Sequence, residues 1–176
     1  AIADTAPGGR LRTRKPTGQV AYPLILVEGA EKSGKTYLAL ELSASERVGR
    51  TFVFELGERA ADEYAPLGDY EIVEHNGTYA DLFGQLREAC MEPSPVDRPN
   101  VIVLDSASML WVLLKDQASA AARRSKRAVK ILTDYPDADI ETTMTYWNTA
   151  SERWWAVINL LRGWPGITIL TARAGE

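Results

Sequence analysis

Short apolar runs alternate with longer amphipathic stretches along most of this chain. Five runs of four or five residues predict strands, at positions 23–27, 51–55, 71–74, 101–105 and 167–171, and the 71–74 run is the weakest. Strands that are apolar at nearly every position are typical of a sheet covered on both faces. The alternation therefore predicts an α/β fold with a mainly parallel sheet flanked by helices.

Three stretches have helical periodicity. Residues 37–48 predict a helix that Gly49 ends, and residues 79–89 place apolar side chains at i, i+3, i+4, i+7 and i+10. A third helix has a continuous apolar face over 147–161 and ends near Gly163 and Pro165. Its tryptophans, Trp147 and Trp154, belong to that face, so we expect them to pack in the core rather than to stack on nucleic-acid bases.

One domain accounts for nearly all of this pattern. Hydrophobic residues make up 45% of the 176 positions, which is enough for one substantial core. We expect a flexible basic arm over 1–20 and a single domain over 21–176. Because the chain starts without a methionine and stops shortly after its last apolar run, we also expect further protein downstream. The basic residues of the expected arm include Arg10, Arg12, Arg14 and Lys15.

The composition limits the kinds of functional site that this chain can contain. The formal net charge is −4, so a surface for nucleic acid must be local. Cys90 is the only cysteine and His75 the only histidine, which excludes an internal disulfide and argues against a histidine-centred catalytic triad. No apolar stretch approaches the roughly 20 residues of a membrane-spanning helix. We expect a cytoplasmic protein without a membrane partner, with His75 and Cys90 in structural roles.

One motif has a specific chemical meaning. After the first predicted strand the chain matches G-x-x-x-x-G-K-T, the P-loop or Walker A pattern, and a predicted helix follows. The glycines let the backbone wrap a phosphate, Lys35 reaches the phosphates, and the Thr36 hydroxyl is placed to bind Mg²⁺. The residues of the motif are Gly29, Ala30, Glu31, Lys32, Ser33, Gly34, Lys35 and Thr36.

Further candidates stand at the ends of the other predicted strands, where open α/β sheets bind their ligands. Asp105 follows four apolar residues and is the expected second metal ligand, unless it only caps the next helix. Glu55 and Glu58 are candidates for the base that activates water, and either could be a solvated loop carboxylate. Thr171 is a candidate contact to the γ-phosphate, or an ordinary β-branched strand residue.

A group of five cations lies in eight residues without an acid. If that segment is one helix, four of them fall at i, i+3, i+4 and i+7 and share a face. Such a strip suits a phosphate backbone, and the alternative is an ordinary solvated helix face. The cations are Arg123, Arg124, Lys126, Arg127 and Lys130.

With these residues in view, the chain resembles the RecA-like P-loop ATPases, and is most similar to compact members encoded by tailed phages and associated with single-strand annealing and recombination. Three stretches, 29–36, 52–64 and 101–108, look like the P-loop, the second strand with its following acid, and the Walker B run. Residues 146–154 and 167–173 look like the phage branch in particular.

The resemblance implies a role for each matching residue. Where the family usually has Asp-x-Glu after the second strand, this chain has Glu-Leu-Gly-Glu, so both glutamates stay candidates for the base. The implied roles are phosphate binding by Lys35, Mg²⁺ binding by Thr36 and Asp105, water activation by Glu58 or Glu55, and γ-phosphate sensing by Thr171.

The resemblance also implies ATP and Mg²⁺ as ligands, single-stranded DNA as a partner, and assembly of copies into a ring or filament. We expect an ATPase that acts on single-stranded DNA in recombination or annealing, in the host cytoplasm if the protein is phage-encoded. Two alternatives remain: a nucleotide-dependent switch or loader subunit without significant hydrolysis, and a kinase of nucleotides or other small molecules. Activation of water by a glutamate separates the first alternative from the ATPase.

Overall fold

The fold is built on one five-stranded, all-parallel sheet with the order β1-β5-β4-β2-β3. The computed structural model describes residues 13–18, 20–57 and 59–174. The strands are β1 (Leu24–Gly29), β2 (Thr51–Glu55), β3 (Glu71–Ile72), β4 (Val101–Asp105) and β5 (Ile167–Arg173). The α-helices are α1 (Lys35–Glu41), α2 (Tyr79–Met91), α3 (Ala107–Arg123), α4 (Lys126–Asp134) and α5 (Met144–Gly163), and the 3₁₀ helices are η1 (Leu42–Ala44) and η2 (Ala61–Leu67). The predicted α/β class is confirmed.

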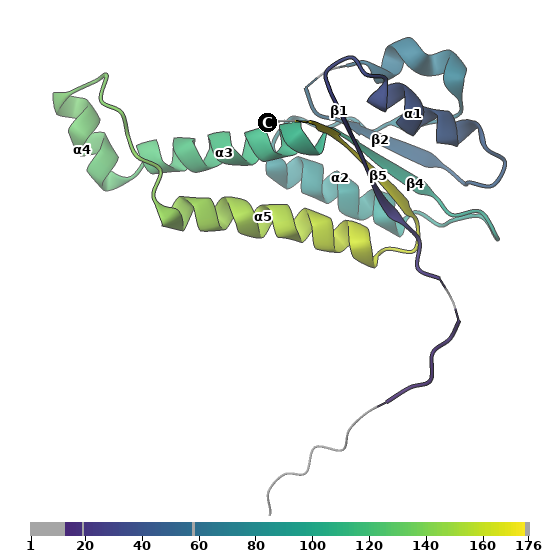
Figure 1. Cartoon of the computed structure of the whole chain (residues 1–176). Helices are drawn as coiled ribbons and strands as arrows, with labels where there is room; N and C mark the ends of the chain where they lie inside the picture. The colour runs from purple at the N-terminus through teal and green to yellow at the C-terminus, as the bar shows by residue number, and fades with distance from the viewer. Residues whose placement is uncertain (1–12, 19, 58, 175–176) are drawn as a thin grey trace, which may run out of the picture.

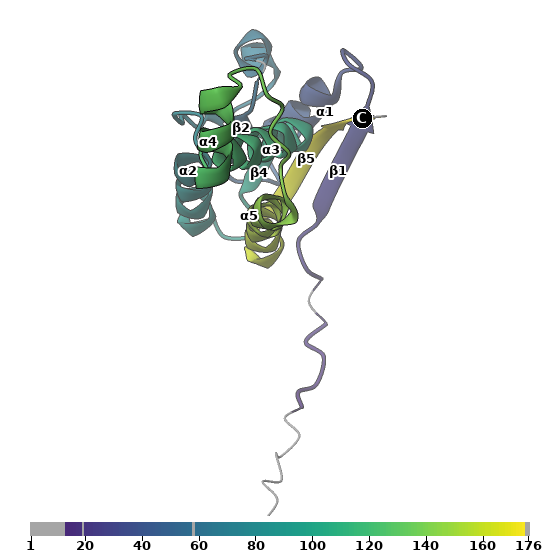
Figure 2. The same cartoon turned by 90° about the vertical axis from the view of Figure 1, so that its left-hand side faces the viewer.

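Successive side chains of the strands enter two separate cores, one on each face of the sheet. Helices α2, α3 and α5 cover one face, and α1 with η2 covers the other (Figures 1 and 2). This arrangement explains why β2 and β4 are apolar at almost every position, since both of their faces are buried. The first core takes Phe52, Phe54, Ile102, Leu104 and Leu170, and the second takes Val53, Val101, Val103 and Ile169.

The helix expected over 37–48 is shorter in the structure. It ends at Glu41 and continues only as the single turn of η1. The Ser43 hydroxyl donates to the Leu40 carbonyl (2.7 Å), and the Ser45 hydroxyl accepts from the Arg47 amide (3.3 Å). Serine side chains that bond to nearby backbone groups compete with helical hydrogen bonds. The prediction was therefore wrong in its second half, where a turn replaces the helix.

The segment between β4 and β5 forms a helical arm, residues 107–163. Figure 1 shows α3 and α5 side by side, with α4 at their far end, away from the sheet. The rings of Trp111 and Trp154 meet edge to face at 6.0 Å, and Arg153 Nη1 donates to Gln117 Oε1 (2.5 Å). Trp147 and Trp154 pack against the core as predicted, whereas Trp155 is exposed on the outer side of α5.

β1 is an edge strand despite its apolar sequence. Among the described residues it pairs only with β5, and the Ile25 and Leu26 side chains are 40% and 56% exposed (Figure 2). Consecutive side chains point to opposite faces, so both faces of this strand are open. Of the basic arm expected over 1–20, residues 1–12 and 19 lie outside the described residues, and 13–18 form neither helix nor strand.

Candidate functional site

All five strands run in the same direction, so their carboxyl ends meet at one edge of the sheet. At this edge β1 leads into the Gly29–Thr36 loop, and the loop leads into α1. Gly34 begins α1 with φ of 85°, a left-handed conformation that glycine adopts without steric cost. A Cβ on Gly29 would lie 2.6 Å from Ser33 Oγ, so a larger residue there would require the Ser33 side chain to move.

Lys35 is the first residue of α1, and its ammonium folds back over the loop. Its Nζ donates to the carbonyl oxygens of Gly29 (3.0 Å) and Ala30 (2.6 Å). An ammonium group has three N–H donors, so a third remains for an anion in the loop. The structure thus places the Lys35 charge at the loop that the sequence predicts to bind phosphate.

Asp105, at the end of β4, is hydrogen-bonded through its side chain to α1 and to β5. Thr36 Oγ1 donates to its Oδ2 at 2.6 Å, across a sequence separation of 69 residues. The Thr171 hydroxyl, on β5, donates to the other carboxylate oxygen, Oδ1. Thr171 is fully buried, so its hydroxyl fixes the Asp105 carboxylate from the interior of the protein. The structure brings together Lys35, Thr36, Asp105 and Thr171, four residues that the sequence singled out.

The first turn of α3 begins directly after Asp105. Ser106 caps the helix, and its hydroxyl accepts from the Met109 amide (3.3 Å). In the same turn, the hydroxyl of Ser108 accepts from the Arg173 amide of β5 (2.9 Å). The cap that we considered as the alternative for Asp105 is therefore provided by Ser106, which leaves the Asp105 carboxylate for the site.

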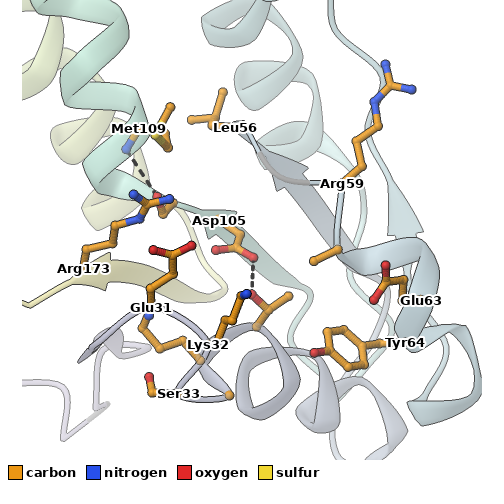
Figure 3. A pocket seen from close by; sticks show the side chains of 15 residues that line it. Glu31, Lys32, Ser33, Leu56, Arg59, Glu63, Tyr64, Asp105, Met109 and Arg173 are labelled. Atoms are coloured by element: carbon orange, nitrogen blue, oxygen red, sulfur yellow. Dashed lines mark hydrogen bonds between the residues drawn. The ribbon is translucent and has the colours of Figure 1, made fainter.

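A pocket of about 480 Å³ lies over these groups, within the range of small-ligand sites. Figure 3 shows Glu31 and Arg173 near Asp105 and, across the pocket, Glu63 and Tyr64 of η2. Sequence reasoning gave no role to Glu63 or Tyr64, because the segment that contains them has no strand or α-helix periodicity. The lining residues are Glu31, Lys32, Ser33, Gly34, Lys35, Thr36, Leu56, Arg59, Ala60, Glu63, Tyr64, Asp105, Ser106, Met109 and Arg173.

Glu55 lies at the end of β2, beside Asp105 in the strand register. Its Oε1 accepts from the Ala61 amide (2.7 Å), and its backbone carbonyl lies 2.9 Å from His75 Nε2. Burial raises the pKa of Glu55 above its ordinary value, and the hydrogen bond from Ala61 opposes that rise. The carboxylate therefore shapes the loop that leads into η2. Glu58, the other candidate base, lies outside the described residues.

The predicted basic strip is divided between two helices. Arg123 ends α3, Arg124 caps it, and Ser125 begins α4 by accepting from the Ala128 amide (3.2 Å). The segment is therefore not one helix, which was the condition for four cations on one face, because Ser125 caps a new helix at that point. All five cations are still exposed, and all lie at the end of the helical arm that is far from the sheet (Figure 1).

Other kinds of site find little support in the part of the chain that the structure describes. No three His, Cys, Asp or Glu side chains there are grouped to hold a metal ion by themselves. None of the described helices has the length and apolar character to span a membrane. Cys90 packs against the core, and burial raises the pKa of its thiol to about 11, so little of it is a reactive thiolate.

The chain matches no protein-family model and no curated protein.

Proposed function

We propose that this chain is a Mg²⁺-dependent ATPase with a RecA-like core, acting on single-stranded DNA in recombination or annealing. The observation that supports this most directly is the 2.6 Å hydrogen bond between Thr36 and Asp105. The sequence predicts these two residues as Mg²⁺ ligands for separate reasons, one from a loop motif and one from a strand end. Their meeting in the pocket that Lys35 also lines is what a site for a metal-bound polyphosphate requires.

The donor set fits a magnesium nucleotide. The protein would provide only two ligands for the metal, the Thr36 hydroxyl and the Asp105 carboxylate. Two are enough, because Mg²⁺ in proteins usually keeps several waters and takes its other oxygens from phosphates. Lys35 and the amides of the Gly29–Thr36 loop would hold the phosphates, and Tyr64, which lines the same pocket, provides an aromatic ring near which a base could stack. When bound, Mg²⁺ supplies charge neutralisation and orients the phosphate oxygens.

Hydrolysis also requires a residue that positions water and accepts its proton. We assign this role to Glu58, because the Glu55 carboxylate is already bound by the Ala61 amide. Glu58 follows Glu55 by three residues in the same loop. Glu63 is the alternative, since it lines the same pocket as Lys35. Thr171 then acts through Asp105, as a positioning residue.

The test is steady-state ATP hydrolysis with Mg²⁺, with Lys35→Ala as the blank. We expect Glu58→Gln to abolish turnover while nucleotide affinity is kept, and Glu63→Gln to retain most of the activity. Full turnover in Glu58→Gln together with loss of turnover in Glu63→Gln would assign the role of the base to Glu63 of η2. Unchanged nucleotide affinity in Lys35→Ala would contradict the proposed phosphate site altogether.

A nucleotide-dependent switch or loader without significant hydrolysis is the second candidate. The engagement of Glu55 with the backbone favours it, because one oxygen of the carboxylate nearest to Asp105 in the strand register already accepts from the Ala61 amide. Tight nucleotide binding with slow turnover that is indifferent to DNA, in the unmodified protein, would support the switch.

We place single-stranded DNA on the end of the helical arm. The five cations there are exposed and form no ion pair with any described residue, so each is available to a phosphate. Single-strand binding loses affinity with salt with a slope of about −0.7 per phosphate neutralised. Replacing Lys126, Arg127 and Lys130 by Ala should therefore flatten the slope by about 2.

The matched control for this strip replaces three exposed arginines elsewhere, Arg47, Arg87 and Arg162, by Ala. This control alters the net charge by the same amount and should leave the slope almost unchanged. Equal slopes in the two triple variants and the unmodified protein would remove the arm from the DNA interface.

A further inference from the structure

The charges of α4 oppose its own helix dipole. Lys126 and Arg127 occupy the first turn, where the backbone is partially positive, and Asp134 ends the helix, where the backbone is partially negative. Both placements destabilise the helix relative to the opposite arrangement of charge. A partner that brings negative charge to the first turn and positive charge to the last turn would relieve both ends at once. A nucleic acid, which is uniformly negative, would relieve only the first.

The residues that follow the basic strip have the opposite charge. From Asp134 to Glu141 there are four acids and no basic residue, whereas the strip from Arg123 to Lys130 has five cations and no acid. All nine side chains are exposed. We name residues 134–141 the acidic segment. It joins α4 to the return helix α5 and therefore lies at the same end of the arm as the strip (Figure 1).

The strip and the acidic segment do not neutralise each other within the chain. Among the residues that the structure describes, the ion pairs join Arg50 to Glu71 and Glu92, far from the arm end. The acidic segment instead makes its own turn, in which the Ala138 amide donates to the Tyr135 carbonyl (3.0 Å). Two oppositely charged surfaces are thus held beside each other with their charges unpaired.

We propose that a second copy of this chain docks on α4, so that the basic strip of each copy lies against the acidic segment of the other. A two-fold axis between two arm ends makes this contact twice, because an isologous interface repeats every pair. Antiparallel α4 helices then bring the partner's acids to the positive first turn and the partner's cations toward Asp134. Val129, which is 53% exposed beside the cations, adds an apolar contact.

This pairing is independent of the nucleotide chemistry and competes with DNA for the same cations. A self-paired arm covers the strip, so single-stranded DNA should dissociate the pair as it binds. Because both contacts are electrostatic, the pairing should also weaken as salt increases.

The test is the molar mass in solution by light scattering, at low and at high salt. We expect twice the chain mass of 19.4 kDa at low salt and the single chain at high salt. Two charge reversals probe the two surfaces: Lys126, Arg127 and Lys130→Glu, and Asp134, Asp137 and Asp139→Lys. Both place favourable charge at the ends of α4, so the helix should be retained, and circular dichroism checks this.

Each reversed variant alone should be a single chain at low salt, and an equimolar mixture of the two should regain the double mass. The control, Arg47, Arg87 and Arg162→Glu, should stay paired. A single chain in the unmodified protein at low salt, pairing that persists in either reversed variant, or a mixture that fails to associate would each overturn the proposal. The acid-reversed variant keeps the strip, so its DNA binding tests the DNA proposal separately.

Discussion

Asp105 is the residue on which the site geometry depends most. Both of its carboxylate oxygens accept hydroxyl hydrogen bonds, and its backbone carbonyl accepts from the Leu56 amide (2.6 Å). A carboxylate held from several sides has little freedom to rotate, so its position does not need to be established when a ligand arrives. The buried hydroxyl of Thr171 contributes to this without access to the pocket.

Replacing Thr171 by Val tests this role. Valine keeps nearly the same volume in a fully buried position but removes the hydrogen bond to the Asp105 carboxylate. We expect the free energy of unfolding to fall by about 1–3 kcal/mol, as for a lost hydrogen bond to a charged group. Urea unfolding measures it, with Thr149→Val on the exposed side of α5 as the control, expected within about 0.5 kcal/mol. A loss no larger than that of the control would contradict the role.

Glu55 makes stability depend on pH. Because burial raises its pKa above the ordinary value of 4.5, the folded protein favours the protonated form. The resulting stabilisation is complete below pH 4.5 and is lost as the pH rises through the raised pKa. Glu55→Gln stays neutral and can still accept from Ala61, so its stability relative to the unmodified protein should increase from acid to neutral pH.

Urea unfolding at a series of pH values measures this difference. Glu88→Gln, on the exposed side of α2, is the control and should show a much smaller dependence. A difference between Glu55→Gln and the unmodified protein that stays constant across the series would show that burial does not penalise the Glu55 charge.

At the scale of elements, the helical arm has a packed part and an unpacked part. Leu114 of α3 is 1% exposed and belongs to the core, whereas α4 has only Ala128 fully buried. Leu114→Ala should therefore lower the free energy of unfolding by about 2–5 kcal/mol, as for a large core residue cut to Ala. Val129→Ala should cost less than about 1 kcal/mol. Comparable losses in urea unfolding would mean that α4 packs as tightly as α3.

Elements with strong periodicity could be predicted from the sequence, whereas two breaks between helical segments could not. β2, β4 and α2 lie where their apolar patterns place them, because burial on known faces determines those patterns. At the breaks near Ser43 and Ser125 a serine hydroxyl is hydrogen-bonded to a backbone group, donating at Ser43 and accepting at Ser125, and hydrophobic periodicity does not reveal such bonds. The same limit applies to the basic strip, because the pattern of charges does not reveal that Ser125 divides it between α3 and α4.

At the scale of the whole molecule, the strand ends determined which candidates came together. Lys35, Thr36, Asp105 and Thr171 could be predicted as neighbours because parallel strands end at one edge. Glu63 and Tyr64 could not, since they reach the pocket through a 3₁₀ helix after β2 that has no sequence period of its own. The exposure of β1 could not be predicted either, because an apolar run indicates burial and does not say what covers it.

The edge position of β1 has a consequence for amide hydrogen exchange. The Pro23 carbonyl accepts from the Thr168 amide of β5, and the Gly29 carbonyl accepts from the Ala174 amide just after β5. The odd-numbered backbone groups of β1 therefore turn toward β5. The even-numbered ones turn to solvent. We therefore expect slow exchange at Ile25 and Val27 and fast exchange at Leu24 and Leu26, resolved by NMR. Any segment that pairs with this edge would slow the fast set first, so these two amides would report what covers the strand that leads into the Gly29–Thr36 loop.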